Sequence, residues 1–164
     1  MELTNFRNMY IAELQELVSA ERQLVASLLG MSGAASHPTL KSALIRHREH
    51  TQFQKERLDA ILRRYGASPT AHTDQAMQSL LNETAKMIAM LKGDDLRDAG
   101  LISSVQKLVH YEIAAYGTAA ALAGQLDLRD EQELLHRSLE EEKRTDFLLT
   151  QLAKREVNPE AVAA

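Results

Sequence analysis

The side chains most able to bind a metal ion interrupt four apolar helical patterns near their middles. Glu21 and Glu112 each occupy a position in an otherwise apolar pattern, and His47 and Glu142 do the same in two further patterns. A carboxylate in an apolar core is costly unless it gains a proton, a hydrogen-bond donor or a cation. The spacing therefore predicts a polar layer inside the fold, and a bound cation is one way to stabilise it.

The patterns themselves have the spacing of long helices. Apolar residues recur in alternating steps of three and four, which is typical of helices that bury one side. This spacing covers residues 10–31, 40–65, 102–123 and 135–152, and a shorter helical pattern covers about residues 74–92. Ser36 and Pro38 provide a capping residue and a first-turn proline for the second helix. No strand pattern competes, so the sequence predicts an all-α protein.

The lengths of the connections predict the topology. Short turns near residues 35 and 127 make each neighbouring pair of long helices antiparallel. The shorter helix between the pairs is long enough to carry the chain back along the bundle. We therefore predict a ferritin-like four-helix bundle forming a single domain over residues 1–164. Its helix hairpins lie at about 4–66 and 95–156, and its crossover helix lies at about 74–92.

An internal repeat supports this arrangement. Adding 91 to a position in the first hairpin gives its counterpart in the second, so that Glu21 corresponds to Glu112 and His50 to Glu141. Several leucines of the apolar patterns correspond in the same way. In an antiparallel hairpin, residues equally far from the turn lie side by side. Glu21 therefore lies opposite about residue 48, and Glu112 lies opposite about residue 143. The polar residues of all four helices therefore converge at one height.

The chemistry of these residues suits a transition metal. Carboxylate oxygen and imidazole nitrogen bind iron, manganese and zinc, and helix bundles hold paired iron or manganese ions in this way. Glu21 and Glu112 are expected to bridge or anchor the metal, and His47 and Tyr116 to support the ligands from behind. Iron is the preferred metal, with manganese or zinc as alternatives. The predicted metal-site residues are Glu21, His47, His50, Glu112, Glu141 and Glu142.

The same residues also have purely structural explanations. A buried glutamate is often a satisfied structural carboxylate, and His47 could simply hydrogen-bond one. Tyr65 and Tyr116 are more often core or capping residues than redox groups. The alternative is a metal-free helical interaction module that dimerises through an apolar flank and keeps the polar layer for specificity. The sequence leaves open whether the protein is an enzyme.

Composition narrows the function classes further. The 164 residues are 45% hydrophobic and 26% charged, which is ordinary for one globular domain. A net charge of −4 argues against nucleic-acid binding. The absence of cysteine excludes disulfides, thiolate zinc sites and iron–sulfur clusters. No apolar run approaches the length of a membrane span and the start lacks an export signal, so we expect a cytoplasmic protein.

Four stretches of the chain resemble the YciF-like domain of unknown function. They are residues 19–24, 47–58, 140–146 and, most specifically, 110–117, which read His-Tyr-Glu-Ile-Ala-Ala-Tyr-Gly. The resemblance covers nearly the whole chain. It implies a bundle of the ferritin-like, rubrerythrin-related superfamily, a link to bacterial stress responses and a homodimer. It implies no established biochemical activity.

Two positions depart from the pattern of that family. His50 and Val109 stand where members usually have glutamate. Imidazole can still coordinate a metal, but valine cannot, so Glu112 is left as the single ligand of its helix. The resemblance therefore implies a singly or weakly occupied site rather than a complete di-iron centre. The function that we expect is metal binding, with a redox role in stress response as its extension.

Overall fold

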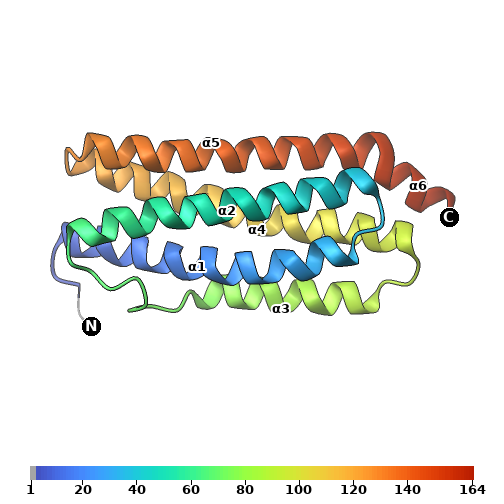
Figure 1. The fold of residues 1–164 in the computed structure, drawn as a ribbon, viewed down its shortest axis with the longest axis horizontal. Helices are drawn as coiled ribbons and strands as arrows, with labels where there is room; N and C mark the ends of the chain where they lie inside the picture. The colour runs from blue at the N-terminus through green and yellow to red at the C-terminus, as the bar shows by residue number, and fades with distance from the viewer. Residues whose placement is uncertain (1–2) are drawn as a thin grey trace.

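The structure is a computed structural model that describes residues 3–164 (Figure 1). Its four long helices are α1 (Phe6–Ala34), α2 (Pro38–Arg64), α4 (Asp94–Gln125) and α5 (Arg129–Leu152). A shorter helix, α3 (Gln75–Met90), lies between α2 and α4 in the sequence, and the chain ends in α6 (Asn158–Ala163). The all-α prediction is confirmed for the described residues. None of their helices is both long and apolar enough to cross a membrane.

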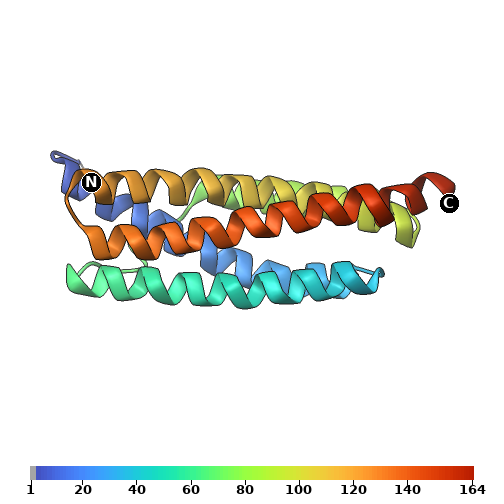
Figure 2. The same ribbon diagram turned by 90° about the horizontal axis from the view of Figure 1, so that it is seen from above.

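The helices form a four-helix bundle with one long crossover, as predicted. In Figure 1, α2 and α4 run in one direction, and α1 and α5 run in the other. The closest packing is within the hairpins, α1 on α2 and α4 on α5, while α3 packs on α1 and α4. Figure 2, which shows the bundle from above, has α2 and α5 side by side toward the viewer and α3 on the far side. The α2–α5 face is therefore opposite the crossover helix, which leaves it open.

The turn between α1 and α2 is fixed differently from the sequence prediction. Ser36 was expected to cap α2 with its side chain, but no side-chain cap is formed there. Instead, the two carboxylate oxygens of Asp98, on α4, accept hydrogen bonds from the backbone N–H groups of Ser36 (2.9 Å) and His37 (2.7 Å). A carboxylate at a helix N-terminus satisfies free N–H groups and complements the helix dipole. Asp98 thereby ties the first hairpin to the second.

The apolar core is divided into two parts by the polar layer. One part contains residues such as Leu28 and Leu44 and lies toward the turn between α1 and α2. The other contains Leu14, Leu58 and Leu135 and lies toward the turn between α4 and α5. Full burial of one such side chain contributes about 1.5–3 kcal/mol. Apolar packing on both sides therefore holds the four helices in register at the layer between them.

The helical structure continues after α5, beyond the end of the predicted hairpin at about residue 156. A π-helical turn, η1 (Ala153–Val157), leads directly into α6. Pro159 has no N–H to donate to the carbonyl four residues earlier, and its ring crowds that carbonyl. A wider turn relieves this conflict. Val157 is buried against α4 in the core, so the turn continues the packing of the bundle.

Candidate metal centre

Four buried ionisable side chains lie in the gap between the two parts of the core, and each comes from a different long helix. This buried polar layer consists of Glu21 (α1), His47 (α2), Glu112 (α4) and Glu142 (α5), which are at most 1% exposed. The Nε2 atom of His47 lies 3.1 Å from Oε2 of Glu142 and 3.7 Å from Oε2 of Glu112. One potential ligand atom from each of these three residues lies within 4.8 Å of the others.

Hydrogen bonds satisfy only part of the layer. Oε1 of Glu142 accepts a hydrogen bond of 2.8 Å from Gln54, and Tyr116 donates its hydroxyl hydrogen to Oε1 of Glu21. The second oxygen of Glu21, both oxygens of Glu112 and Nδ1 of His47 have no hydrogen-bond partner among the described residues. Buried polar atoms are nearly always paired. The unpaired carboxylate oxygens therefore mark a place for protons or a cation.

Two of the carboxyl groups favour the neutral form. Burial raises the pKa of Glu21 well above its usual range, and the nearby carboxylates of Glu112 and Glu142 raise it further. Burial also raises the pKa of Glu112 well above its usual range, and Glu142 adds to the effect. An ionised carboxylate that loses its water and faces another carboxylate is disfavoured twice. Protons therefore relieve the repulsion when no cation is present.

The other two groups form an ion pair. Burial disfavours the charged form of both, but the mutual attraction and hydrogen bond of Glu142 and His47 outweigh it. The pKa of Glu142 is lowered as a result, and the pKa of His47 is raised. The metal-free layer thus balances its charges with one ion pair and two carboxyls that favour protonation. A divalent cation could take the place of those protons.

Two predicted ligands, His50 and Glu141, lie outside the layer. Glu141 accepts hydrogen bonds of 2.7 and 2.8 Å from Arg57 and one of 3.1 Å from Gln54. Burial opposes ionisation of Glu141, but the hydrogen bond and charge of Arg57 prevail and lower its pKa. His50 is partly exposed. The structure thus brings four of the six predicted residues together and places His50 and Glu141 beside them.

A groove between α2 and α5 connects these outer residues with the layer. It has a volume of ≈ 360 Å³, and both His50 and Glu141 line it. His47 also lines the groove, although its side chain is only 1% exposed. The groove lies on the face that α3 leaves open. It is therefore the side from which a small molecule can approach the layer.

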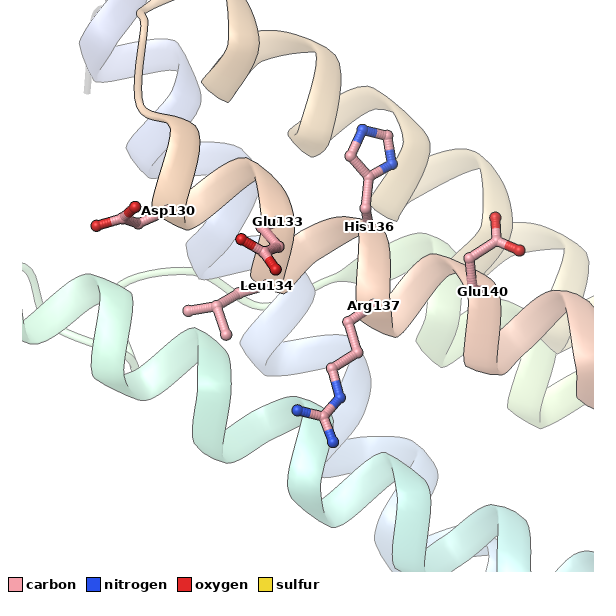
Figure 3. Close-up of a pocket in the computed structure, with 6 residues that line it drawn as sticks. All are labelled: Asp130, Glu133, Leu134, His136, Arg137 and Glu140. Atoms are coloured by element: carbon pink, nitrogen blue, oxygen red, sulfur yellow. The ribbon is translucent and has the colours of Figure 1, made fainter.

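Another pocket lies on the outer face of α5 (Figure 3). Its acidic side chains extend from α5 in different directions, and Glu140 is paired with Lys143 at 2.8 Å. These carboxylates are exposed to solvent, and they do not converge on a common point. In residues 3–164, the group His47, Glu112 and Glu142 is the one set of three ligand-type side chains that comes together. The pocket in Figure 3 is therefore not a second candidate metal site.

Sequence reasoning missed a buried carboxylate outside the layer, near the turn between α4 and α5. Glu131, 4% exposed, accepts hydrogen bonds from the hydroxyl groups of Tyr10 (2.8 Å) and Tyr65 (2.9 Å) and lies 3.5 Å from Arg64. A signal was available: one step of four residues back from Leu135 along the apolar pattern leads to Glu131. These contacts give Glu131 a structural role.

Comparisons with known proteins agree with the fold. The sequence profile of the family described as Domain of unknown function (DUF892) matches residues 5–162. Protein YciF of Escherichia coli K12 is 38% identical over 162 residues, which is 98% of each chain. The crystal structure of the E. coli stress protein YciF has a TM-score of 0.90 and covers 95% of this chain and 99% of that one.

Two further solved structures extend the comparison. YcfI of Rhodopseudomonas palustris is 30% identical with a TM-score of 0.87, and the match covers 91% of this chain and 95% of that one. A protein of Xanthomonas campestris is 18% identical with a TM-score of 0.76, and the match covers 92% of each chain. The last comparison supports the fold alone. The family profile and the relatives that are at least 30% identical confirm the resemblance to YciF-like proteins.

Proposed function

The chain belongs to the DUF892 family, a domain of unknown function, and we propose that its buried polar layer binds a single divalent metal ion. The observation that carries this proposal is the set of unpaired oxygens. Glu112 has two, and Glu21 has one, in a layer closed to solvent. Similarity to the E. coli stress protein YciF supports a role in stress response.

The donor set supports a transition metal over a magnesium or calcium ion. His47 supplies an imidazole nitrogen, while Glu21, Glu112 and Glu142 supply carboxylate oxygens. Magnesium and calcium prefer all-oxygen surroundings, whereas iron, manganese and zinc accept this mixture. When bound, iron or manganese would supply redox chemistry. Glu112 would be the central ligand, because Glu21 and Glu142 both lie close enough to affect its pKa and its Oε2 is 3.7 Å from Nε2 of His47.

A single ion suits this chain better than a pair. Val109 lies one helical turn before Glu112 and is fully buried, so α4 brings one carboxylate to the layer. Glu141, a further carboxylate of α5, is held outside by Arg57. A pair of ions needs more anionic ligands than the layer itself contains.

The alternative function is a metal-free interaction module, and a specific observation favours it. The ion pair of His47 and Glu142, together with the hydrogen bonds from Gln54 and Tyr116, stabilises much of the layer without a metal. Under this alternative, Glu21 and Glu112 remain protonated and structural.

Metal content and thermal stability distinguish the two functions. Protein purified without an affinity tag is analysed for bound metals, and wild type and Glu21→Gln/Glu112→Gln are melted with and without Fe²⁺, Mn²⁺ or Zn²⁺. A ligand that binds only the folded state raises the melting temperature by mass action. We expect a rise for wild type with at least one metal and no rise for the double variant.

Glu131→Gln is the matched control, because it removes a buried carboxylate remote from the layer. It should be less stable than wild type yet keep the metal-dependent rise. If wild type shows no bound metal and no rise, and the double variant is strongly destabilised, the metal-free function is the correct one.

A further inference from the structure

The groove between α2 and α5 contains two arginines that lack carboxylate partners. Arg46 on α2 and Arg144 on α5 line it from its two sides. Both are exposed, and neither forms an ion pair in the described part of the chain. The one carboxylate of the lining, Glu141, is already neutralised by Arg57. The groove is thus locally positive in a chain with a net charge of −4.

The rest of the lining is largely apolar. Apolar atoms make up most of the lining surface, and hydroxyl groups lie among them. These apolar lining residues are Ala43, Leu148, Leu149 and Leu152. A volume of ≈ 360 Å³ lies within the usual range for small-molecule sites, which are mostly apolar with a few placed polar groups. This groove has that character.

Two histidines at the groove have free nitrogens. The Nδ1 atoms of His47 and His50 are buried and have no hydrogen-bond partner among the described residues. His47 is 1% exposed and still lines the groove, so a ligand that enters there reaches the edge of the buried polar layer. Unpaired buried nitrogens are as uncommon as unpaired oxygens. They provide a second, independent indication of a binding site.

We propose that this groove binds a small monocarboxylate with a short apolar chain. Arg46 and Arg144 would hold the carboxylate, because a guanidinium matches its planar geometry and charge. The apolar chain would lie against the leucines of α5, which removes its surface from water. The positive charge of the groove disfavours a metal cation as its ligand. This inference does not depend on metal binding by the layer.

The test uses hexanoate as the probe and hexanamide as its neutral counterpart. Calorimetric titrations are carried out on the full chain with a chelator present, so that the result is independent of the metal proposal. We expect saturable binding of one hexanoate per chain and at least about tenfold weaker binding of hexanamide. In a parallel NMR titration, the ring signals of His50, assigned with His50→Asn, should shift with hexanoate.

Variants separate a specific site from general attraction of anions. Arg46→Gln/Arg144→Gln should weaken hexanoate binding by about tenfold or more. Arg22→Gln/Arg63→Gln removes the same charge from two other exposed arginines that form no ion pair within residues 3–164, and it should bind as wild type does. All four positions are exposed, so circular dichroism should show every variant folded.

Three results would overturn the proposal. They are equal affinities for hexanoate and hexanamide, equal weakening in the two arginine double variants, and absence of saturable hexanoate binding to wild type. None of them bears on the metal proposal, since the metal melts contain no added carboxylate. Each proposal can therefore fail alone.

Discussion

Two of the places where this bundle buries carboxylates do so under opposite conditions. Glu131, near one end, receives hydrogen bonds from Tyr10 and Tyr65 and has Arg64 beside it. Glu112, in the middle, receives no hydrogen bond on either oxygen from residues 3–164 and lies near two other acidic groups. Both side chains are almost fully buried. Burial of a carboxylate therefore does not by itself indicate function, whereas burial without donors does.

The difference also determines which site can accept a ligand. Around Glu131 the lone pairs are already used, so a cation would have to displace hydrogen bonds. In the buried polar layer a cation would displace only protons, and the carboxylates would gain a partner. Glu131 and the carboxylates of the buried polar layer are thus similar in burial and chemistry. They differ in whether their oxygens are free to bind a cation.

The largest expected difference in stability is between the leucine variants of Glu131 and Glu112. Glu131→Leu leaves buried hydroxyl donors without an acceptor and should lower the free energy of unfolding by about 3 kcal/mol or more. Glu112→Leu removes a group that receives no hydrogen bond from the described residues, so its effect should be near zero or stabilising. Urea denaturation of the metal-free proteins measures both. Similar losses at the two positions would show that the comparison is mistaken.

A smaller effect concerns pH. The folded-state pKa of Glu21 and of Glu112 lies above the unfolded value of about 4.3, so between these values the folded state binds more protons. Stability conferred by these carboxyls is present at low pH and is lost as pH rises through the folded pKa values. Metal-free wild type should therefore lose stability as the pH rises above the unfolded pKa of about 4.3 and through the folded pKa values.

Glu21→Gln/Glu112→Gln should show a shallower slope over the same range. At neutral pH it should be more stable than metal-free wild type by about 1 kcal/mol or more. The raised pKa of His47 acts in the same direction in both proteins, so some slope should persist. Denaturation curves at a series of pH values provide the measurement, and parallel pH profiles would refute the assignment.

The smallest expected change in stability concerns the partly exposed pair of Arg57 and Glu141, beside the buried polar layer. The pKa of Glu141 is lowered, so its contribution is present above the unfolded pKa and is lost as pH falls through the folded value. Glu141→Gln should cost about 1 kcal/mol or less at neutral pH, and the difference should disappear in acid. The exposed Lys143, paired with Glu140, is the control: Lys143→Gln should change stability still less. A loss at Glu141 that persists in acid would show that Arg57 is not its cause.

Much of the fold could be predicted because apolar spacing reports directly on helices and their buried sides. Glu21, His47, Glu112 and Glu142 lie in those patterns, and the mirror positions across each turn indicated that they meet. Glu141 could not be placed by spacing, since its position depends on Arg57, a residue from another helix. Glu131 was missed because the pattern was read from Leu135 onward. Patterns locate buried positions well, but they do not identify hydrogen-bond partners.

The layer takes one side chain from each long helix, and this has a consequence for how the site is assembled. The first hairpin contributes Glu21 and His47, and the second contributes Glu112 and Glu142. Neither half contains a site of its own. The layer is thus a junction between two similar halves, comparable to the interface of a heterodimer. If the chain were cut within the crossover, the two hairpins would have to associate as separate fragments to form the site. Assembly of the site would then depend on the concentrations of both fragments.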